Sequence, residues 1–295
     1  MTWLHASDGV RLRAAVWNGG EKGLVVLLTG RSEHLEKYGH VVARLSALGY
    51  SVAGVDWRGQ GLSDRRFAAR NIGHIRDFQL YQRDLEALLA HPGVAAFGAR
   101  RVFLGHSTGG LVGLRALRRG LSVRGAIFSG PLWDLDFPGP TGPLMRTLLR
   151  LAPFLGLGWL FMPTADGTPY SVRQHFNGNA LMGNPERYDW FRNQLLTYPQ
   201  LGLGGPSLGW LSAVLREARA LRPPPAPLVP ILTFLGSEET IVSPRAIRAY
   251  SAHQPNARLV EMDGAQHEVL METPEIQAQV WAEIETFLRK HLPAA

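Results

Sequence analysis

Short apolar runs recur along the first part of the chain and alternate with stretches that have helical spacing. The apolar runs cover residues 23–29, 50–55, 101–104 and 125–128. The helical patterns cover residues 38–48, 78–89 and 108–119. Runs that are apolar on both faces are typical of strands buried in a parallel sheet. The alternation therefore predicts an α/β fold with a mostly parallel, doubly wound sheet.

Two further features extend this pattern at its ends. Residues 2–6 and 10–17 flank Asp8-Gly9, a turn signal that predicts an N-terminal hairpin. Alternation also returns late in the chain, with strand patterns at 230–235 and 257–261 and helical patterns at 244–253 and 276–290. The sheet is thus expected to combine strands from two distant parts of the sequence.

The segment between them has a different character. Residues 131–227 hold four of the eight tryptophans, many prolines and glycines, and short helical stretches at 143–151 and 209–221. The segment ends on Pro223-Pro224-Pro225-Ala226-Pro227, which predicts a stiff extended spacer. We therefore expect residues 1–130 and 228–295 to form the sheet core and residues 131–227 to form an inserted helical cap.

The strand pattern at 101–104 leads into Gly105-His106-Ser107-Thr108-Gly109, directly before a helical pattern. A serine in such a strand-to-helix turn is presented at the carboxyl edge of a sheet, and glycines are needed where side chains would clash. The amide after the serine lies at a helix N-terminus, where it stabilises an oxyanion. Ser107 is therefore the candidate nucleophile; the alternative is a serine that merely caps the helix.

A nucleophilic serine requires a base and a carboxylate that orients it. In this architecture the chain order is serine, acid, histidine. His267 follows the last strand pattern and is the candidate base. The acid is expected after the strand at 230–235, where Glu238 and Glu239 both qualify.

Several separate stretches resemble the α/β-hydrolase superfamily and, within it, the monoacylglycerol lipase and lysophospholipase group. They are Thr29-Gly30-Arg31-Ser32-Glu33-His34 with Tyr38, Asp56-Trp57-Arg58-Gly59-Gln60-Gly61-Leu62-Ser63, Gly73-His74-Ile75-Arg76-Asp77-Phe78, Gly105 to Gly110, Gly236 to Val242, and Gly264-Ala265-Gln266-His267-Glu268. The first loop is similar to the bacterial lysophospholipase L2 branch, which also has Gly-Arg followed by Glu. The resemblance implies an α/β-hydrolase fold with a cap over the site.

The resemblance also implies a role for each matching residue. Ser107 falls on the family's nucleophile, His267 on its base and Glu239 on its acid, with the oxyanion amides at Arg31 and Thr108. Two departures stand out. Glutamate replaces the usual aspartate, which adds a methylene, and Thr29-Gly30 replaces the usual His-Gly before the oxyanion residue.

These residues together predict a serine ester hydrolase that acts through an acyl-enzyme on lipid monoesters, a lysophospholipid or a monoacylglycerol. No metal or organic cofactor is expected. One alternative is a small-molecule carboxylesterase on the same scaffold. The other is a catalytically inactive binding protein, although an unbroken set of Ser107, Glu239 and His267 argues against it.

Amino-acid composition and net charge exclude some classes of protein and of partner. With 45% hydrophobic and 19% charged residues the chain has an ordinary globular balance, and the absence of cysteine excludes disulfides and thiolate sites. The net charge of +7 is spread over scattered arginines, which argues against nucleic acid and leaves contact with anionic lipid as a secondary expectation. We see no signal-peptide pattern and no apolar run of membrane-spanning length, so a cytoplasmic protein is expected.

Overall fold

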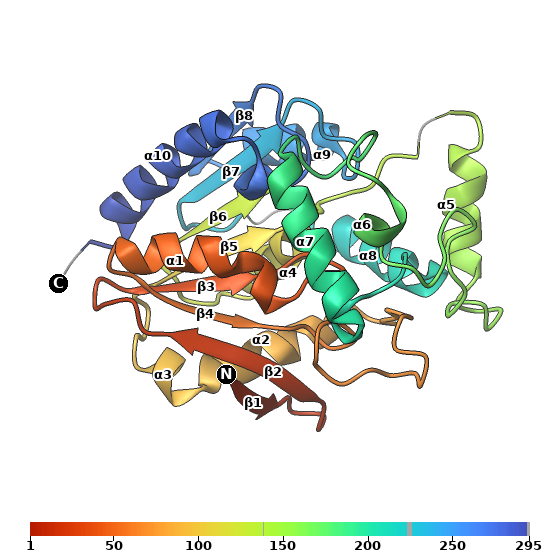
Figure 1. The fold of residues 1–295 in the computed structure, drawn as a ribbon, viewed down its shortest axis with the longest axis horizontal. Helices are drawn as coiled ribbons and strands as arrows, with labels where there is room; N and C mark the ends of the chain where they lie inside the picture. The colour runs from red at the N-terminus through yellow and green to blue at the C-terminus, as the bar shows by residue number, and fades with distance from the viewer. Residues whose placement is uncertain (138, 223–225, 294–295) are drawn as a thin grey trace.

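The structure, a computed structural model, describes residues 1–137, 139–222 and 226–293. Its centre is an eight-stranded sheet with the order β1-β2-β4-β3-β5-β6-β7-β8 (Figure 1). The strands are β1 (Thr2–His5), β2 (Arg11–Trp17), β3 (Leu24–Leu28), β4 (Ser51–Val55), β5 (Arg101–His106), β6 (Gly125–Ser129), β7 (Ile231–Gly236) and β8 (Ala257–Met262). β1 and β2 pair antiparallel and β2 also runs antiparallel to β4, whereas all other pairs are parallel.

The N-terminal hairpin lies where the sequence predicts it. The turn between β1 and β2 is closed by a hydrogen bond of 2.8 Å from Gly9 N to Ala6 O. Gly9 has a φ of 82°, a conformation that favours glycine. The hairpin forms one edge of the sheet, and the parallel strands run from β4 to β8 at the other edge.

Helices cover both faces of the sheet. The core helices are α1 (Gly39–Ala47), α2 (Leu80–Ala90), α3 (Pro92–Ala95), α4 (Thr108–Arg118), α9 (Pro244–Ala252) and α10 (Pro274–His291), with short 3₁₀ turns η1 (Leu35–Tyr38) and η3 (Val269–Met271). Alternate residues of β3 divide between the faces. Leu24, Val26 and Leu28 pack with α2 and α4, whereas Val25 and Leu27 pack with α1 and α10. Burial of both faces explains why these strands read as continuous apolar runs.

Between β6 and β7 the chain forms a group of helices beyond one end of the sheet (Figure 1). They are α5 (Gly142–Leu151), α6 (Tyr170–Arg173), α7 (Pro185–Thr197), the turn η2 (Pro199–Leu201) and α8 (Leu208–Ala220). α5 and α8 match the helical stretches expected there, whereas α6 and α7 were not expected. The described part of residues 131–227 contains one isolated β-bridge, between Phe161 and Ser207. Pro223–Pro225 of the expected spacer lie outside the described residues.

None of the helices in the described ranges is long and apolar enough to cross a bilayer. The α/β-hydrolase architecture expected from the sequence is confirmed by the sheet order and by the layers of helices. Because β3, β5, β6, β7 and β8 run parallel, the loops that follow them meet at one edge of the sheet. Four of these loops carry the candidate site residues.

Candidate active site

Ser107 forms the turn between β5 and α4 in a conformation that few side chains adopt. Its φ and ψ are 48° and −113°. Outside glycine, positive φ angles cost free energy and persist where the surrounding structure holds them. Here the amide of Ser107 donates to Ser129 O at 3.0 Å, and its carbonyl accepts from Leu132 N at 2.9 Å. The serine side chain is thereby held at the sheet edge, with 8% of its surface exposed.

The glycines around Ser107 are required by close backbone approach. A Cβ at Gly109 would overlap the carbonyl of Leu28, and a Cβ at Gly105 would lie 3.0 Å from Gly109 O. Gly109 is therefore required where α4 packs against the end of β3, and Gly105 where the end of β5 meets the first turn of α4. The motif holds the strained serine in place.

His267 and Glu239 are joined by a hydrogen bond of 2.6 Å between Nδ1 and Oε2. His267 lies in the loop after β8 and Glu239 in the loop after β7, and both side chains are buried. The other oxygen of Glu239 accepts from the amides of Ile241 at 2.6 Å and Val242 at 3.1 Å. Glu238 is exposed to solvent. Of the two glutamates left open by residue order alone, the structure brings Glu239 to the histidine.

The electrostatics of this pair favour a charged acid. Burial alone would raise the pKa of the Glu239 carboxyl, but the His267 ring and the two amides outweigh it and hold the pKa below its usual value. Gly130 sits against both groups with a φ of 47°. A Cβ there would lie 3.0 Å from His267 Nδ1 and 3.2 Å from Glu239 Oε2. Gly130 is a requirement of the site that sequence reasoning missed.

The two candidate oxyanion amides belong to the loops after neighbouring parallel strands. Thr108 is the first residue of α4, and Arg31 lies three residues beyond β3, whose Leu28 pairs with Gly105 of β5. Within the described residues neither amide donates a hydrogen bond to a protein acceptor. Such free N–H donors at a helix start and in an adjacent loop are suited to a negatively charged oxygen.

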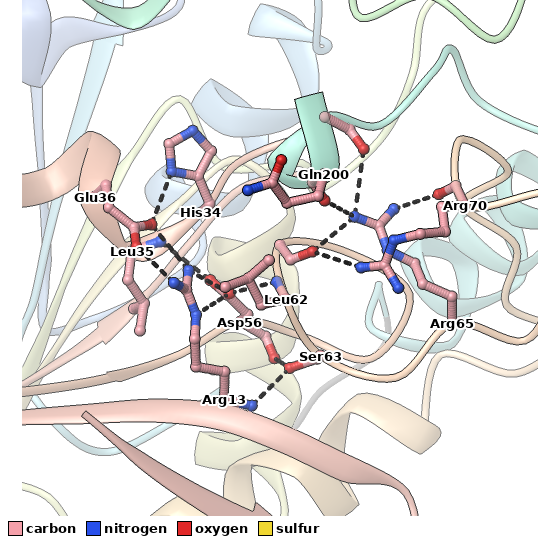
Figure 2. A network of polar contacts seen from close by, with 12 residues as sticks. Arg13, His34, Leu35, Glu36, Asp56, Leu62, Ser63, Arg65, Arg70 and Gln200 are labelled. Carbon is pink, nitrogen blue, oxygen red and sulfur yellow. Dashed lines mark hydrogen bonds and ion pairs between the residues drawn. The ribbon is translucent and has the colours of Figure 1, made fainter. Parts of the chain in front are cut away.

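The loop that carries Arg31 is fixed by polar side chains from the β4 side. Gln60 Nε2 donates to Gly30 O at 2.9 Å, and Gln60 Oε1 accepts from Ser32 N at 3.1 Å. Asp56 accepts from Leu35 N at 3.0 Å and from Arg13 Nε at 2.7 Å (Figure 2). The Asp56 to Ser63 stretch therefore positions this loop through its side chains.

A buried group of charged side chains lies behind the site, and sequence reasoning did not predict it. The Lys37 ammonium bonds Glu33 and Glu268, Tyr38 donates to Glu33 at 2.6 Å, and His106 Nε2 lies 3.3 Å from Glu268. All of these side chains are almost fully buried. Glu33 also accepts from the amide of Gly30, next to Arg31. The group therefore links the oxyanion loop to the residue that follows His267.

Charge within this group is arranged as ion pairs. Burial lowers the pKa of the His106 ring, but Glu268 and Glu33 more than offset it and raise the pKa overall. Burial likewise works to raise the pKa of Glu268, and His106 and Lys37 reverse that effect. The His106 ring lies 4.7 Å from the His267 ring, measured between centroids. The charged group is thus in direct contact with the candidate base.

Glu33, His106 and Glu268 present ligand-type atoms within 4.8 Å of one another, which is a spacing that metal ions favour. The Lys37 ammonium bonds the carboxylates of Glu33 and Glu268 in the same place. A buried ammonium already supplies the positive charge that these carboxylates need. The donor set therefore does not fit a metal ion.

Comparisons with known proteins identify the family and the fold. The sequence profile of the hydrolase family described as serine aminopeptidase S33 matches residues 19–274. The probable lysophospholipase L2 of Haemophilus influenzae is 27% identical over 268 residues, covering 90% of this chain and 83% of that protein. Lysophospholipase L2 of Escherichia coli is 27% identical over 288 residues, covering 91% and 81%. A soluble variant of monoglyceride lipase from Saccharomyces cerevisiae has a similar fold, with a TM-score of 0.75, 20% identity and coverage of 98% and 94%.

Proposed function

Because the chain belongs to the hydrolase family described as serine aminopeptidase S33, we propose that it is a serine ester hydrolase that cleaves lipid monoesters. The substrate is a lysophospholipid or a monoacylglycerol, as the names of its lysophospholipase and monoglyceride lipase relatives suggest. The observation that carries the proposal is the buried His267–Glu239 hydrogen bond beside the strained Ser107 turn. A histidine whose Nδ1 is bonded to a buried carboxylate is the kind of base that a serine nucleophile requires.

In the first half of the reaction, Ser107 Oγ attacks the acyl carbonyl carbon while His267 accepts the hydroxyl proton. Glu239 stabilises the imidazolium that forms and keeps the ring oriented through its bond to Nδ1. The amides of Arg31 and Thr108 donate to the oxygen that becomes negative. The tetrahedral intermediate then breaks its bond to the alcohol, and His267 gives that alcohol its proton.

In the second half, a water molecule attacks the acyl-serine. His267 accepts the proton of the water, the second tetrahedral intermediate collapses, and the proton returns to Ser107 Oγ. The products are a fatty acid and the deacylated alcohol. Each step uses side chains and amides of this chain and needs no cofactor.

The helices between β6 and β7 supply the apolar surface that an acyl chain needs. We assign residues 131–227 as the cap, with the same boundaries as the sequence predicts. α5 and the turns after it are unusually apolar at their surface, with Leu144 71%, Phe154 85%, Leu155 67% and Trp159 52% exposed. Exposed apolar patches of this kind mark ligand or membrane contacts.

Basic residues lie next to this apolar surface. Arg146 and Arg150 of α5, Arg216 and Arg219 of α8, and Arg222 just after α8 line a groove of about 590 Å³. Arginines beside exposed apolar side chains are suited to an anionic lipid surface, where the head groups are negative. The cap would then meet the membrane from the cytoplasmic side, where such lipids are abundant.

Labelling with a fluorophosphonate probe tests the serine chemistry. Wild-type protein should be labelled, and Ser107→Ala should not be, while circular dichroism shows the same fold. A panel of lysophospholipids, monoacylglycerols and short nitrophenyl esters then tests the substrate class. Failure of labelling would favour the inactive binding protein, and activity confined to acetate and butyrate esters would favour the small-molecule carboxylesterase.

A further inference from the structure

Arg31 holds a positive charge beside the active site without a carboxylate to balance it. Its guanidinium donates to Gly205 O at 2.7 Å and to Ser32 Oγ at 2.9 Å, and lies 5.0 Å from the centre of the Trp210 ring. Its Nε is buried and has no hydrogen-bond partner. Among the described residues no aspartate or glutamate forms an ion pair with it.

Three other arginines that point into the protein form ion pairs with carboxylates. Arg13 pairs with Glu36 and Asp56, Arg58 pairs with Asp8 and Asp84, and Arg115 pairs with Glu217. In each case the partners outweigh burial and raise the pKa of the guanidinium. In these three cases a carboxylate balances the charge of a guanidinium that points into the protein.

Among the described residues Arg31 has no such carboxylate partner, and neither does its neighbour Arg65. Burial, with a smaller contribution from the charge of Arg65, lowers the pKa of Arg31 to about 10. Within the described residues Arg65 bonds the carbonyls of Gly61, Arg70, Gln200 and Gly202 and no carboxylate. Figure 2 shows the side chain of Arg65 beside Arg70 and Gln200. The Arg65 Nε is also buried without a partner. Asp56 is the carboxylate that acts on Arg65, and Asp56 is bonded to Arg13.

The two arginines sit where the cap segment meets the catalytic loop. Arg31 reaches Gly205 O and Arg65 reaches Gly202 O, so both hold the stretch between η2 and α8. Gly73 packs against this contact, because a Cβ there would lie 3.1 Å from the Arg31 guanidinium. Since the backbone amide of Arg31 is the proposed oxyanion donor, its guanidinium is one arginine side chain away from the reacting carbonyl.

We propose that Arg31, supported by the charge of Arg65, binds the phosphate of the substrate head group and selects lysophospholipids over neutral monoacylglycerols. The inference rests on the proposed function. A guanidinium with a free N–H and no counter-ion is suited to a phosphate oxygen, which it binds through short, charge-assisted hydrogen bonds. In a lysophospholipid the phosphate is separated from the ester only by the glycerol carbons, which matches a binding group beside the oxyanion amide.

The test compares two substrates that share an acyl chain. Hydrolysis of 1-oleoyl-lysophosphatidic acid and of 1-oleoylglycerol is measured in mixed micelles of a neutral detergent, for wild type and for Arg31→Met. We expect the ratio of kcat/KM values, charged over neutral, to fall by about tenfold or more, mainly through KM. Arg31→Lys, which keeps the charge but loses the planar fork, should restore part of the ratio.

The ratio separates recognition from a purely structural role. Both substrates meet the same protein, so a loss of folded enzyme lowers both rates and leaves the ratio unchanged. An unchanged ratio in Arg31→Met would overturn the proposal and leave Arg31 as an anchor for the cap. Arg66→Met is the matched control. Arg66 is exposed and adjacent to Arg65, and the substitution removes the same positive charge as Arg31→Met. A similar fall in that control would assign the effect to net charge and also overturn the proposal.

A second measurement distinguishes a lipid head group from free phosphate. Inorganic phosphate and glycerol 3-phosphate are added separately while the melting temperature of wild type and Arg31→Met is followed. Stabilisation by glycerol 3-phosphate that is lost in Arg31→Met supports the proposal. Stabilisation by inorganic phosphate alone, with no substrate selectivity, would assign the site to free phosphate and contradict it. Turnover of 1-oleoylglycerol, lost in Ser107→Ala, tests the proposed function independently of either result.

Discussion

Lys37 and Glu268 form a buried ion pair across 231 positions of sequence. Lys37 lies at the end of the loop after β3, and Glu268 directly follows His267 in the loop after β8. Because Lys37 also bonds Glu33, which holds the amide of Gly30, one ammonium connects the proposed oxyanion loop to the proposed base. Lys37, together with His106, which lies near both Glu33 and Glu268, thus ties together two loops that begin on non-neighbouring strands.

Replacing that ammonium should cost far more stability than replacing a surface charge. Lys37→Met leaves Glu33 and Glu268 buried without their cation, and breaking a buried pair in this way costs about 3–5 kcal/mol. Arg119→Met is the control, because its ion pair with Glu86 is exposed on both sides and worth at most about 1 kcal/mol. Urea denaturation of both variants measures the difference. Equal losses would show that the buried group does not hold the loops together.

The orienting role proposed for Glu239 predicts a sharp contrast with its neighbour. Glu239→Gln should lower kcat by about 10⁴-fold, as amide replacement does in other serine triads, because the histidine tautomer is no longer fixed. Glu238→Gln should change kcat little, since Glu238 points to solvent. Steady-state kinetics on a nitrophenyl ester measures both. The reverse ranking would reassign the acid.

Gly130 offers a test of how tightly the site is packed. An alanine there introduces a methyl group at 3.0 Å from His267 Nδ1, and the φ of 47° is unfavourable for alanine. We expect Gly130→Ala to lower kcat by about a hundredfold or more, since small displacements of catalytic groups are costly. Gly120→Ala shares the positive φ but has open space around its Cβ. It should lose about 1 kcal/mol of stability and keep its activity.

The sheet and the loops that bear the site were predictable because each is a local signal. Apolar runs mark buried strands, and the Gly105–Gly109 motif marks a strand-to-helix turn, so parallel topology alone brings Ser107 and His267 to one edge. α7 was missed because its thirteen residues bury only Tyr188, Phe191 and Leu195, which is a weak helical pattern.

The buried charges could not be predicted from the sequence, because lysine and glutamate are normally at the surface. Lys37 is 1% exposed only because Glu33 and Glu268 surround it, and Glu268 comes from the far end of the chain. Gly130 is similar, since its requirement appears only once His267 and Glu239 are placed. Contacts made across the fold leave no periodic trace in the sequence.

The raised pKa of His106 makes the free energy of unfolding fall as the pH becomes alkaline. The folded protein binds the His106 proton more tightly than the unfolded chain, whose histidine has the usual pKa of 6.5. This stabilisation is complete below that pH and is lost as the pH rises through the folded pKa, by up to about 1.4 kcal/mol per pH unit. Groups facing the ring are Glu33, Glu268, Lys37 and His267.

Unfolding free energies between pH 6 and pH 9 measure this dependence. Wild type should lose stability as the pH rises, and His106→Gln should lose less over the same range because the titrating group is absent. His253→Gln is the control, since the His253 ring is exposed and contacts the carbonyl of Ala249. A steep alkaline loss that persists in His106→Gln would trace the dependence to other groups.

The apolar surface of the cap predicts how activity depends on acyl length. Each buried methylene contributes about 0.8 kcal/mol, or roughly fourfold in an equilibrium constant. Catalytic efficiency on nitrophenyl esters from two to sixteen carbons should therefore rise until the acyl site is full. The same apolar surface predicts where the protein contacts a membrane. Phe154 is 85% and Leu155 67% exposed, so the double change Phe154→Ser and Leu155→Ser should weaken binding to anionic vesicles. It should leave hydrolysis of short soluble esters unchanged, since neither side chain touches Ser107 or its partners. Efficiency that falls steadily from acetate upward would contradict the lipid substrate, and vesicle binding that survives the double change would place the membrane contact elsewhere on the protein.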